Sequence, residues 1–129
     1  MKFSMLRLIT IAIMLLLALP AYADSVVQVW NCELDDGKTY KELEAVSQAW
    51  LKAARGMKGG EELEVYLNYA VGAGEDAEGI LFILIAPSFE VWGAFEDRYE
   101  DSPAAEADTA FSDVASCSAP SLWGSVKIE

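Results

Sequence analysis

The chain contains no histidine, and its 129 residues include only two cysteines. Without an imidazole base, Ser-His-Asp and Cys-His catalytic sites are excluded. Zinc sites also draw mainly on histidine and cysteine ligands, so a zinc site is not expected. Carboxylates are the remaining metal ligands, but the acidic, glycine-rich segment 72–79 does not have the spacing of a calcium loop. We therefore expect neither a metal site nor a cofactor.

Positive charge is also scarce, because nine Lys and Arg residues stand against 21 Asp and Glu residues, for a net charge of −12. Such a chain repels the phosphates of nucleic acids and anionic lipid headgroups, so neither is an expected partner. Excess acid favours solubility. It also leaves open an acidic cation-binding protein as a third class of function, beside the two that the sheet face suggests below.

Only the start of the chain has a long apolar run. Lys2 and Arg7 precede it, it extends over residues 8–19, and Pro20 is followed by Ala-Tyr-Ala at 21–23. This order predicts a cleavable signal peptide at 1–23 and a single domain at 24–129, exported to the periplasm or the extracellular medium. An uncleaved anchor is less favoured, because a bilayer span needs roughly 20 apolar residues. We expect no membrane segment after cleavage.

The two cysteines, Cys32 and Cys117, both follow this predicted signal peptide. In an oxidising compartment the simplest arrangement is one intramolecular disulfide. A free nucleophilic cysteine is the alternative, and the lack of a histidine to activate it makes that alternative weaker.

Periodicity predicts four strands and three helices. The predicted strands cover 26–32, 62–71, 80–86 and 121–128. Thr39 and Glu42 form a capping box that starts the first helix, which ends at Gly56. Two shorter helices start after Pro87 and at Ser102-Pro103. Trp50 and Trp92 lie on apolar helical stripes and are interpreted as core residues.

This βαββαβ order is that of an α+β, ferredoxin-like fold. It predicts a four-stranded antiparallel sheet in the order 4-1-3-2, with the helices on one face and the second helical region split in two. Residues 80–86 have no polar side, as an interior strand requires. The same order brings Cys32 close to Cys117.

The sheet face opposite the helices is the expected functional surface. If the helices cover Val27, Val29, Leu63, Val65, Leu67, Val126 and Ile128, the other face displays Gln28, Trp30, Tyr66, Asn68, Trp123, Ser125 and Lys127. Such a surface serves either as a homodimer interface or as a pocket for a small apolar or aromatic ligand. Near the exit of the first strand, Asn31 and Tyr40 are further candidates. The predicted ligand-binding residues are Trp30, Asn31, Tyr66, Asn68 and Trp123.

The element order and the aromatic-rich sheet face resemble the dimeric α/β-barrel superfamily, in which two ferredoxin-like sheets pack face to face. The resemblance covers the chain after residue 23 and implies a homodimer. Its members include haem-handling proteins and cofactor-free oxygenases, but the histidine that ligates haem iron has no counterpart here. Two function classes follow from it. One is a homodimeric binding or interaction domain, and the other is a cofactor-free enzyme with an oxygenase-like or isomerase-like reaction beside Tyr66 and Asn68.

Overall fold

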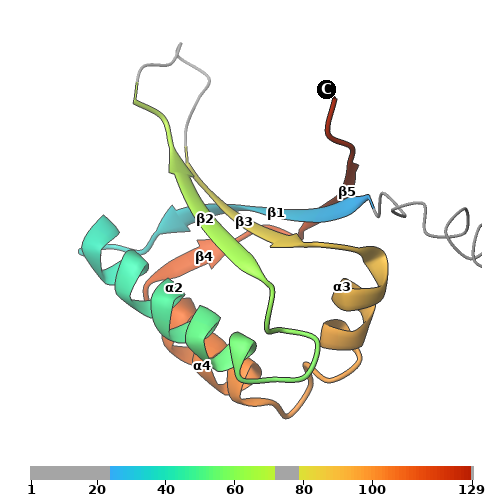
Figure 1. Cartoon of the computed structure of the whole chain (residues 1–129). Helices are drawn as coiled ribbons and strands as arrows, with labels where there is room; N and C mark the ends of the chain where they lie inside the picture. Colours follow the sequence, from blue (N-terminus) through green and yellow to red (C-terminus); the bar gives the residue numbers. More distant parts are fainter. Residues whose placement is uncertain (1–23, 72–78, 129) are drawn as a thin grey trace, which may run out of the picture.

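A computed structural model describes residues 24–71 and 79–128, which form one antiparallel sheet with helices on one of its faces (Figure 1). The strands are β1 (Ser25–Leu34), β2 (Glu64–Tyr69), β3 (Ile80–Ala86), β4 (Ala115–Cys117) and β5 (Ser121–Ser125). The helices are α2 (Tyr40–Arg55), α3 (Phe89–Glu96) and α4 (Pro103–Ser112). None of these helices is long and apolar enough to cross a membrane. The predicted signal peptide lies outside the described residues.

The sheet has the order β2-β3-β1-β4, and β5 also pairs with β1. Both β4 and β5 run antiparallel to β1, with β4 beside residues 32–34 and β5 beside residues 25–29. The predicted order 4-1-3-2 is therefore confirmed, and β4 is an additional short strand in residues that precede the predicted last strand, with a break between it and β5. Pro120 lies in the break, where its missing N–H prevents a continuous ladder.

The last strand is shorter than predicted. Ser125 pairs with Ser25, the first residue of β1, so among the described residues the chain beyond Ser125 has no strand to pair with. Val126 and Ile128 were expected under the helices, but both are exposed. The alternation of apolar residues continued past the end of the sheet and was misleading there.

The helix boundaries follow their capping residues. Thr39 and Glu42 form the predicted capping box at the start of α2. Ser88 accepts a hydrogen bond from the backbone N–H of Val91 at the start of α3, and Ser102 plays the same part for α4. The split of the second helical region is confirmed.

The two faces of β1 are reversed from the prediction. Val26, Gln28 and Cys32 point under the helices and are buried, whereas Val27 and Val29 lie on the opposite, uncovered face. Gln28 is only 8% exposed, and its Oε1 accepts a hydrogen bond of 3.2 Å from the Trp92 indole N–H. This bond offsets the free-energy cost of burying the Gln28 amide. Gln28 can therefore lie under the helices, although the alternation of apolar and polar residues predicted it on the opposite face.

The predicted disulfide is present between Cys32 and Cys117, with an S–S distance of 2.02 Å. The two residues are direct partners in the β1–β4 ladder. The bridge therefore joins the end of β1 to the segment that follows α4, and it links positions 85 residues apart in the chain.

Candidate functional site

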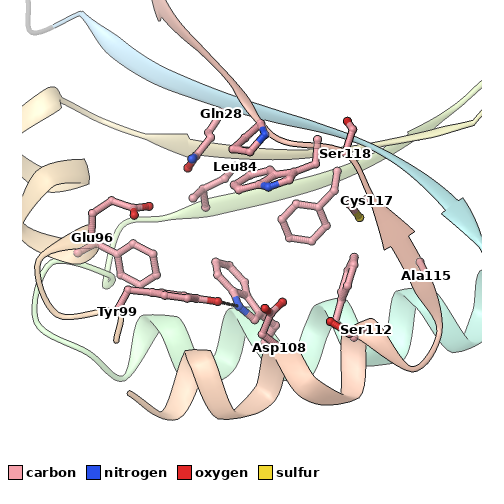
Figure 2. Close-up of a pocket in the computed structure, with 15 residues that line it drawn as sticks. Gln28, Leu84, Glu96, Tyr99, Asp108, Ser112, Ala115, Cys117 and Ser118 are labelled. Carbon is pink, nitrogen blue, oxygen red and sulfur yellow. Dashed lines mark hydrogen bonds between the residues drawn. The ribbon is translucent and has the colours of Figure 1, made fainter. Parts of the chain in front are cut away.

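A cavity of about 450 Å³ lies between the helix-covered face of the sheet and the helices (Figure 2). Its size falls within the range of small-molecule sites, roughly 300–1,000 Å³. Six of its 15 lining residues are aromatic, and the lining comes from the sheet, α2, α3, α4 and the segments next to them. The aromatic lining residues are Trp30, Trp50, Phe82, Phe95, Tyr99 and Phe111.

Phe82, in the middle of β3, organises the aromatic wall. Its ring makes edge-to-face contacts with Trp30, Trp50 and Phe111, at centroid distances of 5.6, 5.8 and 5.3 Å. Edge-to-face packing of this kind favours one arrangement of the rings. The sheet and the two longer helices thus hold the wall of the cavity in a defined shape.

Tyr99, in the turn after α3, supplies a hydroxyl to the cavity. Its oxygen accepts a hydrogen bond of 3.2 Å from the Trp50 indole N–H (Figure 2). Burial raises the pKa of Tyr99, and the charges of Asp108 and Glu96 raise it further, while the Trp50 hydrogen bond acts in the opposite direction. Because Trp50 occupies an acceptor position, the hydroxyl hydrogen of Tyr99 remains available for donation.

Two carboxyl groups complete the polar part of the cavity. Glu96 is the last residue of α3 and Asp108 lies on α4; Figure 2 shows both directed toward the cavity. Burial raises the pKa of each, because partial desolvation disfavours the charged form. The other polar groups of the lining are Gln28, Ser112 and Ser118.

The cavity does not have the ligands of a metal site. Within residues 24–71 and 79–128, no three His, Cys, Asp or Glu side chains are grouped as metal ligands. Two carboxyls among aromatic rings fall short of the six to eight oxygens that Ca²⁺ takes. The arrangement is better suited to holding an apolar body with a few polar contacts, or to moving a proton.

Comparison with known proteins was informative only at the level of structure. No protein-family model matches the chain, and no curated protein matches it. Several solved structures are similar. One is SnoaB, a cofactor-independent oxygenase from Streptomyces nogalater, with a TM-score of 0.58 at 12% identity, covering 82% of this chain and 97% of that one.

A second is a dimeric ferredoxin-like protein of unknown function from Thermobifida fusca, with a TM-score of 0.52 at 11% identity and coverage of 79% and 92% of the two chains. This chain has the ferredoxin-like fold. A putative chlorite dismutase is also similar, with a TM-score of 0.51 at 12% identity, although the match covers 83% of this chain and only 45% of that one. The resemblance to dimeric α/β-barrel proteins is thus confirmed as a resemblance of fold.

The ferredoxin-like domain separates the residues that were predicted to form one site. Trp30 lines the cavity, whereas Tyr66, Asn68 and Trp123 lie on the uncovered side of the sheet. Asn31 pairs with Leu81 on that same uncovered side. The prediction of a single shared face was wrong, because the register of β1 places Trp30 under the helices.

The uncovered side of the sheet, called the open face below, is mostly apolar. Cross-strand pairs join Val27 to Ile85, Val29 to Ile83, and Ile83 in turn to Tyr66. Trp123 pairs with Val27 and is 60% exposed. The Tyr66 hydroxyl donates to Glu64 at 2.7 Å, and this hydrogen bond raises the pKa of Tyr66. The open face consists of Val27, Val29, Asn31, Glu64, Tyr66, Asn68, Leu81, Ile83, Ile85, Ser121, Trp123 and Ser125.

The acidic part of the cavity was not predicted from the sequence. Trp50 was assigned to the core from its apolar stripe, which is correct for packing but incomplete, because Trp50 also lines the cavity. Asp108 carried a usable signal, because it lies between Ala104 and Phe111 at helical spacing, and both of those residues are buried. Asp108 itself is exposed, but a carboxylate that follows the buried side of a helix at this spacing marks a candidate site residue.

Proposed function

We propose that this protein is an exported homodimer that binds a small, largely apolar molecule in the cavity between its sheet and its helices. One observation carries the proposal. The cavity of about 450 Å³ combines aromatic walls with a few polar groups, the usual composition of a ligand site. The binding domain expected from the sequence is therefore retained, but its pocket is placed on the helix-covered side of the sheet.

The homodimer is supported by the open face. Its central residues Val27, Val29, Ile83 and Ile85 are partly buried already, and Trp123 projects from the edge. An apolar surface of this kind is typical of a face that packs against another protein. The similar Thermobifida protein is described as dimeric, which favours a second copy of the chain as the partner. Pairing through the open face would leave both cavities unobstructed by the interface.

A cavity-filling substitution tests the binding site. The neutral fluorophore N-phenyl-1-naphthylamine should bind the exported chain. Ser112→Trp should weaken its binding by about tenfold or more, because the new ring occupies part of the cavity. Thr109→Trp is the matched control, since Thr109 lies on the same helix and outside the lining. Absence of binding to the wild type, or equal loss in both variants, would overturn the proposal.

Export rests on the predicted signal peptide and agrees with the disulfide, which forms and persists in oxidising compartments. The intact mass of protein recovered outside the cytoplasm should correspond to a chain that starts at Asp24 with both cysteines oxidised. A mature chain that retains residues 8–19 would disprove this part of the proposal.

A cofactor-free enzyme is the second candidate, favoured by the grouping of Tyr99, Glu96 and Asp108 in one cavity. A partly desolvated carboxylate is a stronger base than an exposed one, and proton transfer to or from a bound substrate needs such a group. The fold shared with the cofactor-independent oxygenase SnoaB is compatible with this candidate.

The exchange of carbon-bound protons tests the enzyme candidate directly. In D₂O, the wild type should accelerate deuterium incorporation at the acidic C1 position of 2-tetralone, as followed by NMR. Asp108→Asn should remove most of the acceleration, and Asp97→Asn, outside the lining, should not. If the wild type gives no acceleration, the enzyme candidate is rejected and ligand binding remains.

A further inference from the structure

The described part of the cavity carries negative charge without any positive charge to balance it. Its lining includes the carboxyls of Glu96 and Asp108, and no Lys or Arg occurs among the lining residues that the structure describes. Tyr99 is the other ionisable side chain of the lining, since Cys117 is held in the disulfide and does not titrate. A ligand with a carboxylate or phosphate would meet repulsion here and find no cationic partner.

The same cavity presents six aromatic rings. The electron-rich faces of Trp, Tyr and Phe attract cations, and an aromatic cage is a common device for binding quaternary ammonium groups. Trp50 belongs to a cluster of these rings, because its ring lies at centroid distances of 6.0 and 6.4 Å from Phe95 and Tyr99. A cation in the cavity would face a lining that holds both aromatic rings and two carboxyls.

From the aromatic walls and the unbalanced carboxyls, we infer that the cavity selects an organic ammonium cation with an apolar body. The inference rests on the proposed function and specifies the ligand class for the same site. An apolar body fills the space beside Phe82 and Leu84, while the ammonium group lies toward Glu96 and Asp108. A bare metal ion fits less well, since the rings would strip its water without offering enough oxygen ligands.

The properties of the two carboxyls agree with this assignment. Burial raises their pKa values, and within the described residues no hydrogen bond or opposite charge stabilises the ionised form of either carboxyl. A bound ammonium group supplies that partner and favours the ionised form. The net charge of −12 adds a long-range attraction for cations that salt would screen.

Competition among three ligands that share a benzyl group but differ in charge tests the inference. Benzyltrimethylammonium, benzyl alcohol and phenylacetate would each be titrated against N-phenyl-1-naphthylamine bound to the exported chain. The ammonium compound should compete about tenfold more strongly than the alcohol, because it gains cation–π contacts with the rings and attraction to two partly desolvated carboxyls, which the alcohol lacks. Phenylacetate should compete most weakly.

Paired variants separate local from global charge. In the double variant Glu96→Gln/Asp108→Asn, the advantage of the ammonium compound over the alcohol should fall to about twofold or less. The control Asp97→Asn/Glu106→Gln removes the same charge from α4 and the end of α3 but outside the lining, and it should preserve the advantage. If both double variants lose the advantage of the ammonium compound equally, the advantage comes from the net charge of the protein and the inference is overturned.

The outcomes also separate this inference from the function on which it rests. If the fluorophore binds but the alcohol competes as strongly as the ammonium compound, the ligand class is wrong and the binding site stands. If the fluorophore does not bind the wild type at all, the proposed function fails and the inference fails with it.

Discussion

The Trp50 indole N–H donates a 3.2 Å hydrogen bond to the phenolic oxygen of Tyr99, which ties α2 to the turn after α3. Trp50 is buried and Tyr99 is half-buried. The bond therefore satisfies a donor that has little access to water, and it fixes the direction of the Tyr99 hydroxyl in the cavity. Its removal should be measurable both in stability and in the shape of the site.

Tyr99→Phe should lower the free energy of unfolding by about 1 kcal/mol, because the indole N–H of Trp50 loses its partner while the ring packing is kept. Urea denaturation measures this change. Tyr69→Phe on β2 is the matched control, and at that exposed site the change should stay within about 0.5 kcal/mol. Equal effects at the two positions would contradict a structural role for the Trp50–Tyr99 bond.

Asp108→Asn should stabilise the protein slightly at neutral pH, because the Asp108 side chain is partly exposed and water screens much of the effect of burial. Burial raises the folded-state pKa of Asp108 above its ordinary value, so the folded state holds this proton more tightly than the unfolded state does. That contribution to stability is present below the unfolded pKa, about 3.9, and is lost as the pH rises through the folded value. The amide of Asn at position 108 stays neutral at every pH, so the variant does not lose this stability as the pH rises.

The pH profile is the diagnostic measurement for this prediction. The variant should melt above the wild type at pH 7, and the difference should shrink as the pH approaches about 4. Glu96 and Tyr99 face the same cavity, so Glu96→Gln should act in the same direction. Asp97→Asn, outside the lining, serves as the control. A wild type more stable than Asp108→Asn at pH 7 would show that the carboxylate has a stabilising partner.

Ser47→Ala should stabilise the domain by about 1 kcal/mol, since it removes a buried unpaired hydroxyl and adds a better helix former. Ser47 lies within α2 and is 5% exposed, and its Oγ has no hydrogen-bond partner in the described part of the chain. Gln48→Ala, on the exposed side of the same helix, measures the contribution of helix propensity alone. Chemical denaturation should show a clearly larger gain for Ser47→Ala.

The fold was predictable from local patterns because most of them agree with one another. The capping box at Thr39 and the apolar stripe through Leu43 and Trp50 locate α2. The strict alternation in β2 and the wholly apolar β3 indicate an edge and an interior strand, which the sheet order confirms. Pairing of Cys32 with Cys117 then follows from the topology.

The site was less predictable because it depends on the orientation of β1. Valine occurs on both sides of this strand, at Val26 and Val27, so hydrophobic periodicity could not distinguish its faces. In the observed orientation a long-range hydrogen bond from Trp92 satisfies the buried amide of Gln28, and no local pattern encodes that bond. Because the two faces of β1 are exchanged relative to the prediction, Trp30 lies in the cavity, whereas Trp123 lies on the open face.

Cys117→Ser should lower the free energy of unfolding by about 2–5 kcal/mol, the usual loss for a small disulfide-bonded domain. The bridge spans a separation of 85 residues, so its removal frees a long loop in the unfolded state. The secondary structure should persist under mild conditions, as far-ultraviolet circular dichroism would show. Reduction of the wild type should reproduce the loss; an unchanged melting temperature on reduction would mean that the bridge contributes nothing.

Trp123→Glu should dissociate the proposed homodimer while leaving each domain folded. Trp123 pairs with Val27 on the open face and is already largely exposed in the single chain, so the domain itself loses little packing. In the dimer, an unpaired carboxylate would have to be desolvated at a cost of several kcal/mol. Sedimentation equilibrium should show a dissociation constant raised by about a hundredfold or more.

Leu122→Glu is the matched control, because it places the same charge on the neighbouring residue of β5, which points away from the open face. That variant should remain dimeric if the open face is the interface. A wild type that is monomeric at high concentration would end the dimer proposal. Loss of the dimer in both variants would instead show that added charge on β5, rather than the apolar contact at Trp123, controls association.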